Sequence, residues 1–136
     1  MTATCQTGPS PEYALKILVV DDDPKYRFLL KDEIHELDQH VEILEADSGE
    51  GALAFFPECA IQIMVLDYEM PGINGAQVLR KLKDQGISKI AIGLTRYDEP
   101  VLSEMRASCA VAAFCKDKRQ DFLDFLKRRI VMLTAS

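Results

Sequence analysis

The sequence of 136 residues lacks several features that would indicate particular classes of protein. No apolar run approaches the roughly 20 residues that a membrane-spanning helix needs. The polar N-terminal segment contains no apolar stretch of the kind found in signal peptides. Lys and Arg number 16 against 22 Asp and Glu, so the chain lacks the basic excess typical of direct nucleic-acid binding. We therefore expect a cytoplasmic protein that contacts neither nucleic acid nor a membrane.

The cysteines lack the CxxC spacing of redox and zinc motifs. There are four, at Cys5, Cys59, Cys109 and Cys115. With no leader for secretion, we interpret them as reduced and mostly buried thiols.

Apolar residues make up 48% of the chain, which is enough for the core of one domain. The first residues carry Gly8, Pro9 and little apolar content, so residues 1–14 are predicted to be a flexible extension. The predicted domain covers residues 15–131, and residues 132–136 form a short tail.

Short apolar segments alternate with amphipathic ones along this domain. The apolar segments are rich in Val, Ile and Leu, which is typical of parallel strands covered on both faces. We expect them at residues 16–21, 41–46, 61–67, 89–95 and 111–116. The intervening helices are expected to start with Asp23 as N-cap before Pro24, at Ser48, after Asn74-Gly75, at about Asp98 and at about Lys118. This pattern predicts a doubly wound α/β fold, a five-stranded parallel sheet with helices on both faces.

Polar side chains follow four of the predicted strands. Asp21 and Asp22 follow the first, Asp67 the third, Thr95 the fourth and Lys116 the fifth. In a parallel sheet these ends share one edge, where ligands bind.

Each of these residues also has a simpler interpretation. The acidic triplet that ends in Asp23 is also compatible with a solvated loop that caps the next helix. Asp67 is also compatible with a turn before Pro71 and Gly72. Taken together, however, the residues indicate phosphoryl chemistry. A carboxylate can accept a phosphoryl group, and neighbouring carboxylates can hold the Mg²⁺ (or Mn²⁺) that offsets the charge. A lysine and a hydroxyl can then bind the phosphoryl oxygens.

Two segments and two single residues resemble the receiver domains of two-component response regulators. They are ILVVDDDP (17–24), VLDYEMPGINGAQVL (65–79), Thr95 and Lys116. The resemblance implies a flavodoxin-like strand order of 2-1-3-4-5 and phosphorylation of Asp67. It also implies a phosphohistidine donor on a sensor histidine kinase or a phosphotransfer protein. The chemistry implied is self-catalysed phosphotransfer and autodephosphorylation, with no other enzymatic activity.

The resemblance assigns further roles around Asp67. Asp22 corresponds to a direct metal ligand, and Asp21 to one that acts through water. Glu69 corresponds to the position that supplies a backbone carbonyl to the metal. Thr95 corresponds to the switch hydroxyl, and Lys116 to the lysine that pairs with the phosphoryl group.

Three positions depart from the family pattern. The residue after the switch threonine is usually small but is Arg96 here, where it could narrow access to the site or pair with an Asp or with phosphate. The residue after the lysine is often proline but is Asp117 here. A position usually held by Tyr or Phe is Ala113, and Phe114 is out of phase, so it should face the other side of the sheet. An aromatic switch is therefore absent or is supplied by another residue such as Tyr97.

The family tunes its dephosphorylation rate at two positions, which are Glu69 and Tyr97 here. The output is expected to be a protein contact through the fourth helix, the fifth strand and the fifth helix, in a monomer or weak dimer. An adaptor that binds partners without phosphorylation remains the alternative. A flavin binder is disfavoured because DDDPKYR (21–27) has the wrong charge for a phosphate loop. An aspartyl phosphatase is disfavoured because it usually has Asp where Glu69 stands.

Overall fold

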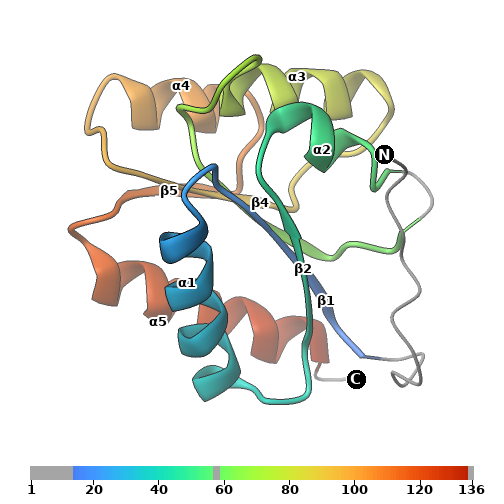
Figure 1. Ribbon diagram of the computed structural model, residues 1–136, viewed down its shortest axis with the longest axis vertical. Coiled ribbons are helices and arrows are strands. Elements are labelled where there is room, and N and C mark those ends of the chain that lie inside the picture. Colours follow the sequence, from blue (N-terminus) through green and yellow to red (C-terminus); the bar gives the residue numbers. More distant parts are fainter. Residues whose placement is uncertain (1–13, 57–58, 135–136) are drawn as a thin grey trace.

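A five-stranded parallel sheet in the order β2-β1-β3-β4-β5 forms the centre of the molecule (Figure 1). The computed structural model describes residues 14–56 and 59–134. The sheet confirms the predicted fold class and strand order. Its strands are β1 (Lys16–Val20), β2 (Glu42–Ala46), β3 (Ile63–Leu66), β4 (Ala91–Thr95) and β5 (Ala112–Cys115).

Three of the strands end one residue earlier than the sequence predicted. Asp21, Asp67 and Lys116 each lie immediately after a strand. The amides of Asp67 and Lys116 still bond to the neighbouring strands, at the carbonyls of Val20 and Thr95, but the ladder stops there. The three charged side chains therefore occupy the first position of a loop, anchored by the end of a strand.

Five helices cover the sheet, with α1 and α5 on one face and α2, α3 and α4 on the other (Figure 1). Their bounds are α1 (Pro24–Leu37), α2 (Gly49–Leu53), α3 (Gly75–Asp84), α4 (Val101–Ala107) and α5 (Arg119–Thr134). Helix α5 continues past residue 131, where the sequence predicted the domain to end. No Gly or Pro interrupts it there. Within the described ranges, no helix is both long and apolar enough to cross a membrane.

The sequence identified the starts of α1 and α2 correctly and that of α3 to within one residue, since Gly75 is its first residue. The side chains of Asp23, Ser48 and Asn74 each accept a hydrogen bond from a backbone amide of the first turn. Helix α4 was predicted wrongly, because it begins at Val101 rather than near Asp98. Proline lacks an amide and disfavours helical geometry in the residue before it, so the segment up to Pro100 forms a turn instead.

Alternate residues of each strand enter two separate layers of the core. On the side of α1 and α5, the layer includes Ile17, Val19 and Ile92, together with Phe122 of α5. Phe114 joins this layer, where its ring contacts that of Phe122 at a centroid distance of 6.3 Å. The prediction that Phe114 faces away from the side of Ala113 is confirmed.

Met105 of α4 fills the space on the opposite side, beside Ala113. A Cβ atom added to Gly93 would lie 2.7 Å from the Met105 sulfur and 3.2 Å from the Ala113 Cβ. The Met105 methyl group also reaches to 3.1 Å from the Cβ position of Gly75, at the start of α3. Met105 is fully buried. A flexible thioether therefore lies against the small side chain that stands at position 113, where the family usually has a ring.

The expectation of reduced thiols is wrong at Cys59, which is disulfide-bonded. Cys109 and Cys115 are free. A search for CxxC detects only cysteines close in sequence, whereas a disulfide requires proximity in space. The predicted flexible extension, residues 1–14, lies almost wholly outside the described residues.

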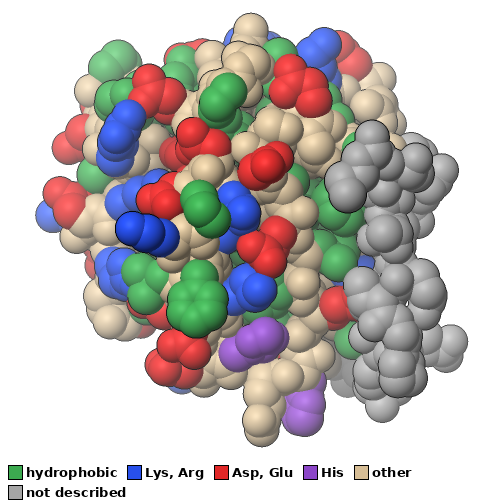
Figure 2. Space-filling model, in the orientation of Figure 1, with side chains coloured by type: hydrophobic (Ala, Val, Ile, Leu, Met, Phe, Trp, Pro, Cys, Tyr) green, Lys and Arg blue, Asp and Glu red, His purple; other side chains and the backbone are tan. Residues whose placement is uncertain are grey.

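Charged side chains of both signs intermingle on the face shown in Figure 2. Acidic and basic groups alternate there over short distances, and several pair directly. Glu45 of β2, for example, accepts from Arg27 at 3.0 Å and from Lys31 at 2.9 Å, both on α1.

Candidate functional site

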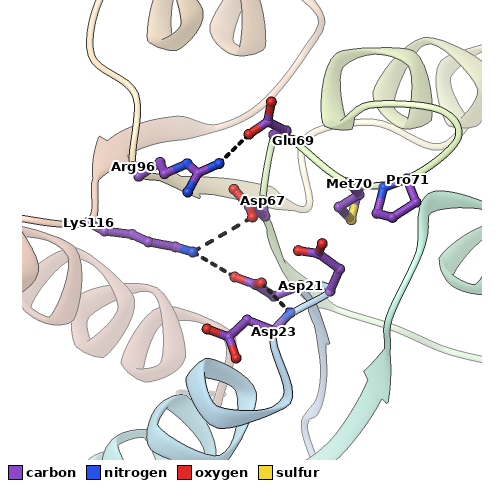
Figure 3. A pocket seen from close by; sticks show the side chains of 9 residues that line it. Asp21, Asp23, Asp67, Glu69, Met70, Pro71, Arg96 and Lys116 are labelled. Atoms are coloured by element: carbon purple, nitrogen blue, oxygen red, sulfur yellow. Dashed lines mark hydrogen bonds and ion pairs between the residues drawn. The ribbon is translucent and has the colours of Figure 1, made fainter.

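A pocket of about 450 Å³ opens at the carboxyl edge of the sheet (Figure 3). The loops after β1, β3 and β4 and the residue after β5 build it, which is the position expected for a ligand site in this kind of sheet. Its lining consists of Asp21, Asp22, Asp23, Asp67, Glu69, Met70, Pro71, Arg96 and Lys116. The structure thus brings together the charged residues that the sequence singled out.

Three carboxylates meet on the floor of this pocket. One oxygen each of Asp21, Asp22 and Asp67 lies within 4.8 Å of the others. Asp21 and Asp67 are buried, while Asp22 is exposed. Backbone amides fix the two buried groups, because Asp23 donates to Asp21 Oδ1 at 2.9 Å and Tyr68 donates to Asp67 Oδ1 at 2.8 Å.

The ammonium of Lys116 joins the two buried carboxylates. Its Nζ lies 2.8 Å from Asp21 Oδ2 and 3.7 Å from Asp67 Oδ2 (Figure 3). The stronger contact is thus with Asp21. The same Nζ lies 4.0 Å from the ring centroid of Tyr26 on α1, a cation–π geometry. Lys116 is therefore held over the floor from two sides.

Burial raises the pKa of Asp67 to about 6, and the negative charge of Asp21 adds to the increase. The charge of Lys116 and hydrogen bonds from the Tyr68 amide and the Thr95 hydroxyl act in the opposite direction. Repulsion and desolvation exceed these favourable contacts. Asp67 thus lies in a site that has more negative charge than its own cation offsets.

The same imbalance is the test of whether the residues fit a divalent cation. Mg²⁺ prefers carboxylate oxygens and usually keeps several waters, so it needs only a few protein ligands on one open side. Asp21, Asp22 and Asp67 supply such oxygens at close range, and Asp22 is open to solvent. The donor set fits Mg²⁺ or Mn²⁺. Glu69 also lines the pocket, and the role of its backbone carbonyl stays a prediction.

Glu69 and Arg96 form the rim of the pocket, and Tyr97 lies beside them. Glu69 Oε1 accepts from Arg96 Nη2 at 2.5 Å and from the Tyr97 hydroxyl at 2.5 Å. The hydrogen bonds from Tyr97 and from Arg96 lower the pKa of Glu69. Arg96 also lies over the Tyr97 ring, at 5.5 Å from its centroid. Arg96 therefore pairs with Glu69, not with one of the floor aspartates.

Tyr97 has a second contact, through an edge-to-face arrangement with Tyr68 at a centroid distance of 6.5 Å. The Tyr68 hydroxyl donates to Glu104 of α4 at 3.0 Å. The residue next to Asp67 is thus joined to α4 by a side-chain hydrogen bond. Ala113 is buried in the core. It has no ring, so this position cannot supply an aromatic contact to either tyrosine.

Two supporting residues were missed from the sequence. One is Tyr26, in the first turn of α1, whose ring contacts Lys116. Arg27 donates to the Asp21 carbonyl at 2.5 Å and pairs with Glu45. The signal was available, because side chains in the first turn of a helix point back toward its N-terminus, here the acidic loop.

Strand order and site together define a class of protein. A sheet in the order 2-1-3-4-5 with an acidic pocket at its carboxyl edge is typical of flavodoxin-like α/β proteins that bind phosphate groups or cations at that edge.

Comparison with known proteins narrows the class to a family. The sequence model of the response regulator receiver domain matches residues 17–124. The chain belongs to this family, the receiver domains of two-component response regulators.

Solved structures agree with that assignment. The response regulator protein TrrA of Thermotoga maritima is 36% identical, with a TM-score of 0.71 over 88% of this chain and 98% of that one. The receiver domain of the Francisella response regulator 1452 is 26% identical, with a TM-score of 0.70 over 85% of this chain and 98% of that one.

Curated relatives are longer than this chain. The positive alginate biosynthesis regulatory protein of Pseudomonas aeruginosa is 33% identical over 84% of this chain and 46% of its own length. The virulence sensor protein BvgS of Bordetella pertussis is 40% identical over 60% of this chain and 6% of its own length. The chain thus spans less than half of these relatives.

Proposed function

We propose that this receiver accepts a phosphoryl group on Asp67 and passes the signal on through a protein contact or onward phosphoryl transfer. The donor is a phosphohistidine on a sensor histidine kinase or a phosphotransfer protein. One observation carries the proposal: a buried carboxylate at a strand end shares a pocket with a lysine and with two further carboxylates at cation-binding distance.

The reaction makes defined demands on this chain. A carboxylate oxygen of Asp67 attacks phosphorus, and the bond from phosphorus to the donor nitrogen breaks with its electron pair left on the imidazole. Asp67 must be ionised to attack, which its burial opposes. The Lys116 ammonium, 3.7 Å from Asp67, is placed to exchange a carboxylate contact for a phosphoryl oxygen. The buried Thr95 hydroxyl is placed to donate to another oxygen.

Asp21, Asp22 and Asp67 would hold the divalent cation, with the Glu69 carbonyl as a further ligand. When bound, the cation neutralises charge on the transferring group and on the carboxylates. The structure of TrrA, which is 36% identical, was solved in complex with Mg²⁺ and BeF. That similarity supports the same ligand preference here.

Acetyl phosphate with Mg²⁺, followed by intact mass measurement, tests the proposal. We expect an adduct of one phosphoryl group that is absent in Asp67→Asn and abolished by EDTA. Asp124→Asn, an exposed carboxylate on α5, is the matched control and should keep the adduct. Failure to form an adduct with acetyl phosphate, phosphoramidate and phosphohistidine donors would contradict the proposal and favour the constitutive adaptor.

We infer that the output contact uses the face formed by α4, β5 and α5. The Tyr68–Glu104 hydrogen bond and the position of Met105 tie α4 to the phosphoryl site, which supports α4 as part of that face. The oligomeric state, a monomer or weak dimer, stays a prediction. A cytoplasmic location also stays a prediction, and the disulfide of Cys59 does not support it because cytoplasmic disulfides are rare.

A further inference from the structure

The pocket contains a second cation besides Lys116. Five carboxylates and two cations are found among the described residues that line it. One cation, Lys116, already contacts both Asp21 and Asp67. The other, Arg96, lies on the rim, and its guanidinium points toward Glu69 across the pocket mouth (Figure 3). An incoming phosphoryl group adds negative charge to this already acidic site.

We propose that Arg96 is a second phosphoryl-binding cation of this site, which Glu69 and Tyr97 hold at rest and release to the phosphoryl group. The inference rests on the proposed phosphorylation of Asp67. It predicts that Arg96 promotes phosphorylation, in contrast to a bulky side chain that merely obstructs the pocket.

Position favours this role. Arg96 directly follows Thr95, whose hydroxyl acts on Asp67, so the arginine backbone lies next to the reacting group. Its side chain is 71% exposed and lines the mouth rather than filling the pocket. A guanidinium presents several N–H groups in one plane, in a geometry that matches two phosphate oxygens. The contact with Glu69 engages one nitrogen, Nη2.

The resting contact is of a kind that exchanges easily. Glu69 is 52% exposed, and exposed ion pairs contribute about 0–1 kcal/mol. Tyr97 donates to the same Glu69 oxygen, so this carboxylate keeps a hydrogen-bond donor when Arg96 leaves. Exchange therefore does not leave Glu69 without a partner.

The phosphorylation rate of Arg96→Ala shows whether Arg96 binds the phosphoryl group or obstructs the pocket. We would measure initial phosphorylation rates with subsaturating acetyl phosphate and Mg²⁺ by intact mass. Arg96→Ala should slow phosphorylation about tenfold, the loss expected for one charge-assisted hydrogen bond. Arg96→Lys should give an intermediate rate, because it keeps the positive charge but not the planar guanidinium that can bind two phosphate oxygens. The affinity for beryllofluoride, measured by thermal shift, should fall in the same order.

Arg106→Ala is the matched control. Arg106 of α4 pairs with Glu99, just before that helix, at 2.8 Å in an ion pair of similar exposure, 43% and 54%, and neither residue lines the pocket. The Arg106→Ala variant should be phosphorylated at the wild-type rate. A rate for Arg96→Ala equal to that of Arg106→Ala, or faster than wild type, would overturn the inference.

Glu69→Gln tests the resting partner. Loss of this carboxylate also removes a repulsive charge, which by itself should accelerate phosphorylation. The increase in rate must therefore be compared between the wild-type and Arg96→Ala backgrounds. If Glu69 restrains Arg96, Glu69→Gln accelerates phosphorylation more in the wild-type background than in Arg96→Ala. Equal gains in both backgrounds would overturn the role of Glu69 as resting partner. Absence of any adduct in the wild type would instead refute the proposed function, and the inference with it.

Discussion

The floor and the rim of the pocket carry similar charges in different surroundings. On the floor, Asp21 and Asp67 are buried, and Lys116 is largely shielded. On the rim, Glu69 and Arg96 are mostly exposed. Burial strengthens electrostatic interactions and makes unpaired charge costly, whereas water screens the rim. The floor is therefore suited to chemistry and the rim to exchange of partners. Removing one partner of an ion pair should change the unfolding free energy much more on the floor than on the rim.

The largest difference should follow from loss of the floor cation. Lys116→Ala leaves two buried carboxylates facing each other without a cation, so without Mg²⁺ we expect a loss of about 3 kcal/mol of unfolding free energy at pH 7.5. Urea denaturation measures it. The exposed Lys118→Ala should change stability by less than about 0.5 kcal/mol. Equal values for the two variants would show that the floor is solvated like the rim.

A smaller and opposite effect should follow from neutralising Asp67. Its pKa is raised to about 6 from 3.8, so the folded state binds the proton more tightly than the unfolded state. The ionised carboxylate then destabilises the fold above pH 6, and this cost disappears as the pH falls toward 4. In metal-free buffer at pH 7.5, we expect Asp67→Asn to add about 2 kcal/mol of unfolding free energy, and less at pH 5.

Magnesium should offset the destabilising effect of the ionised Asp67. Because the cation favours the ionised form, it should raise the melting temperature of the wild type more than that of Asp67→Asn. Asp124→Asn, on α5 and not among the residues that line the pocket, provides the control and should show the wild-type increase. A melting temperature of Asp67→Asn below that of the wild type in EDTA at pH 7.5 would refute the account of the floor.

The smallest effect should be found on the rim. Arg96→Ala and Glu69→Gln each remove one partner of an exposed pair, so their unfolding free energies should lie within about 0.5 kcal/mol of the wild type. Thermal melts in parallel with Lys116→Ala give the comparison directly. A loss above 1 kcal/mol on the rim would mean that the Arg96–Glu69 pair is structural and does not exchange.

Sequence alone predicted the floor better than the rim. Strand ends fix Asp21, Asp67, Thr95 and Lys116, and a run of buried apolar residues reveals where a parallel strand ends. These positions are set by the course of the backbone, which the pattern of apolar residues in the sequence predicts well.

Contacts between side chains of different loops were not predictable in this way. The sequence left open whether Arg96 would meet Glu69, an Asp or phosphate. It gave no indication that Lys116 would lie closer to Asp21 than to Asp67, or that Met105 would fill the space beside Ala113. Each outcome depends on which rotamer fits once two layers are packed, and pattern analysis contains no information about that choice.

Helix α4 rests on the sheet through a thioether, and this has a consequence for its local unfolding. The helix has seven residues, two of them buried, whereas α3 has ten residues, five of them buried. Methionine adapts to small shifts of its surroundings, where a ring would resist them. Short helices with few buried contacts open at lower free energy than the rest of a domain. The amides of α4 should therefore exchange with deuterium before those of α3, and a partner bound to α4 should slow that exchange.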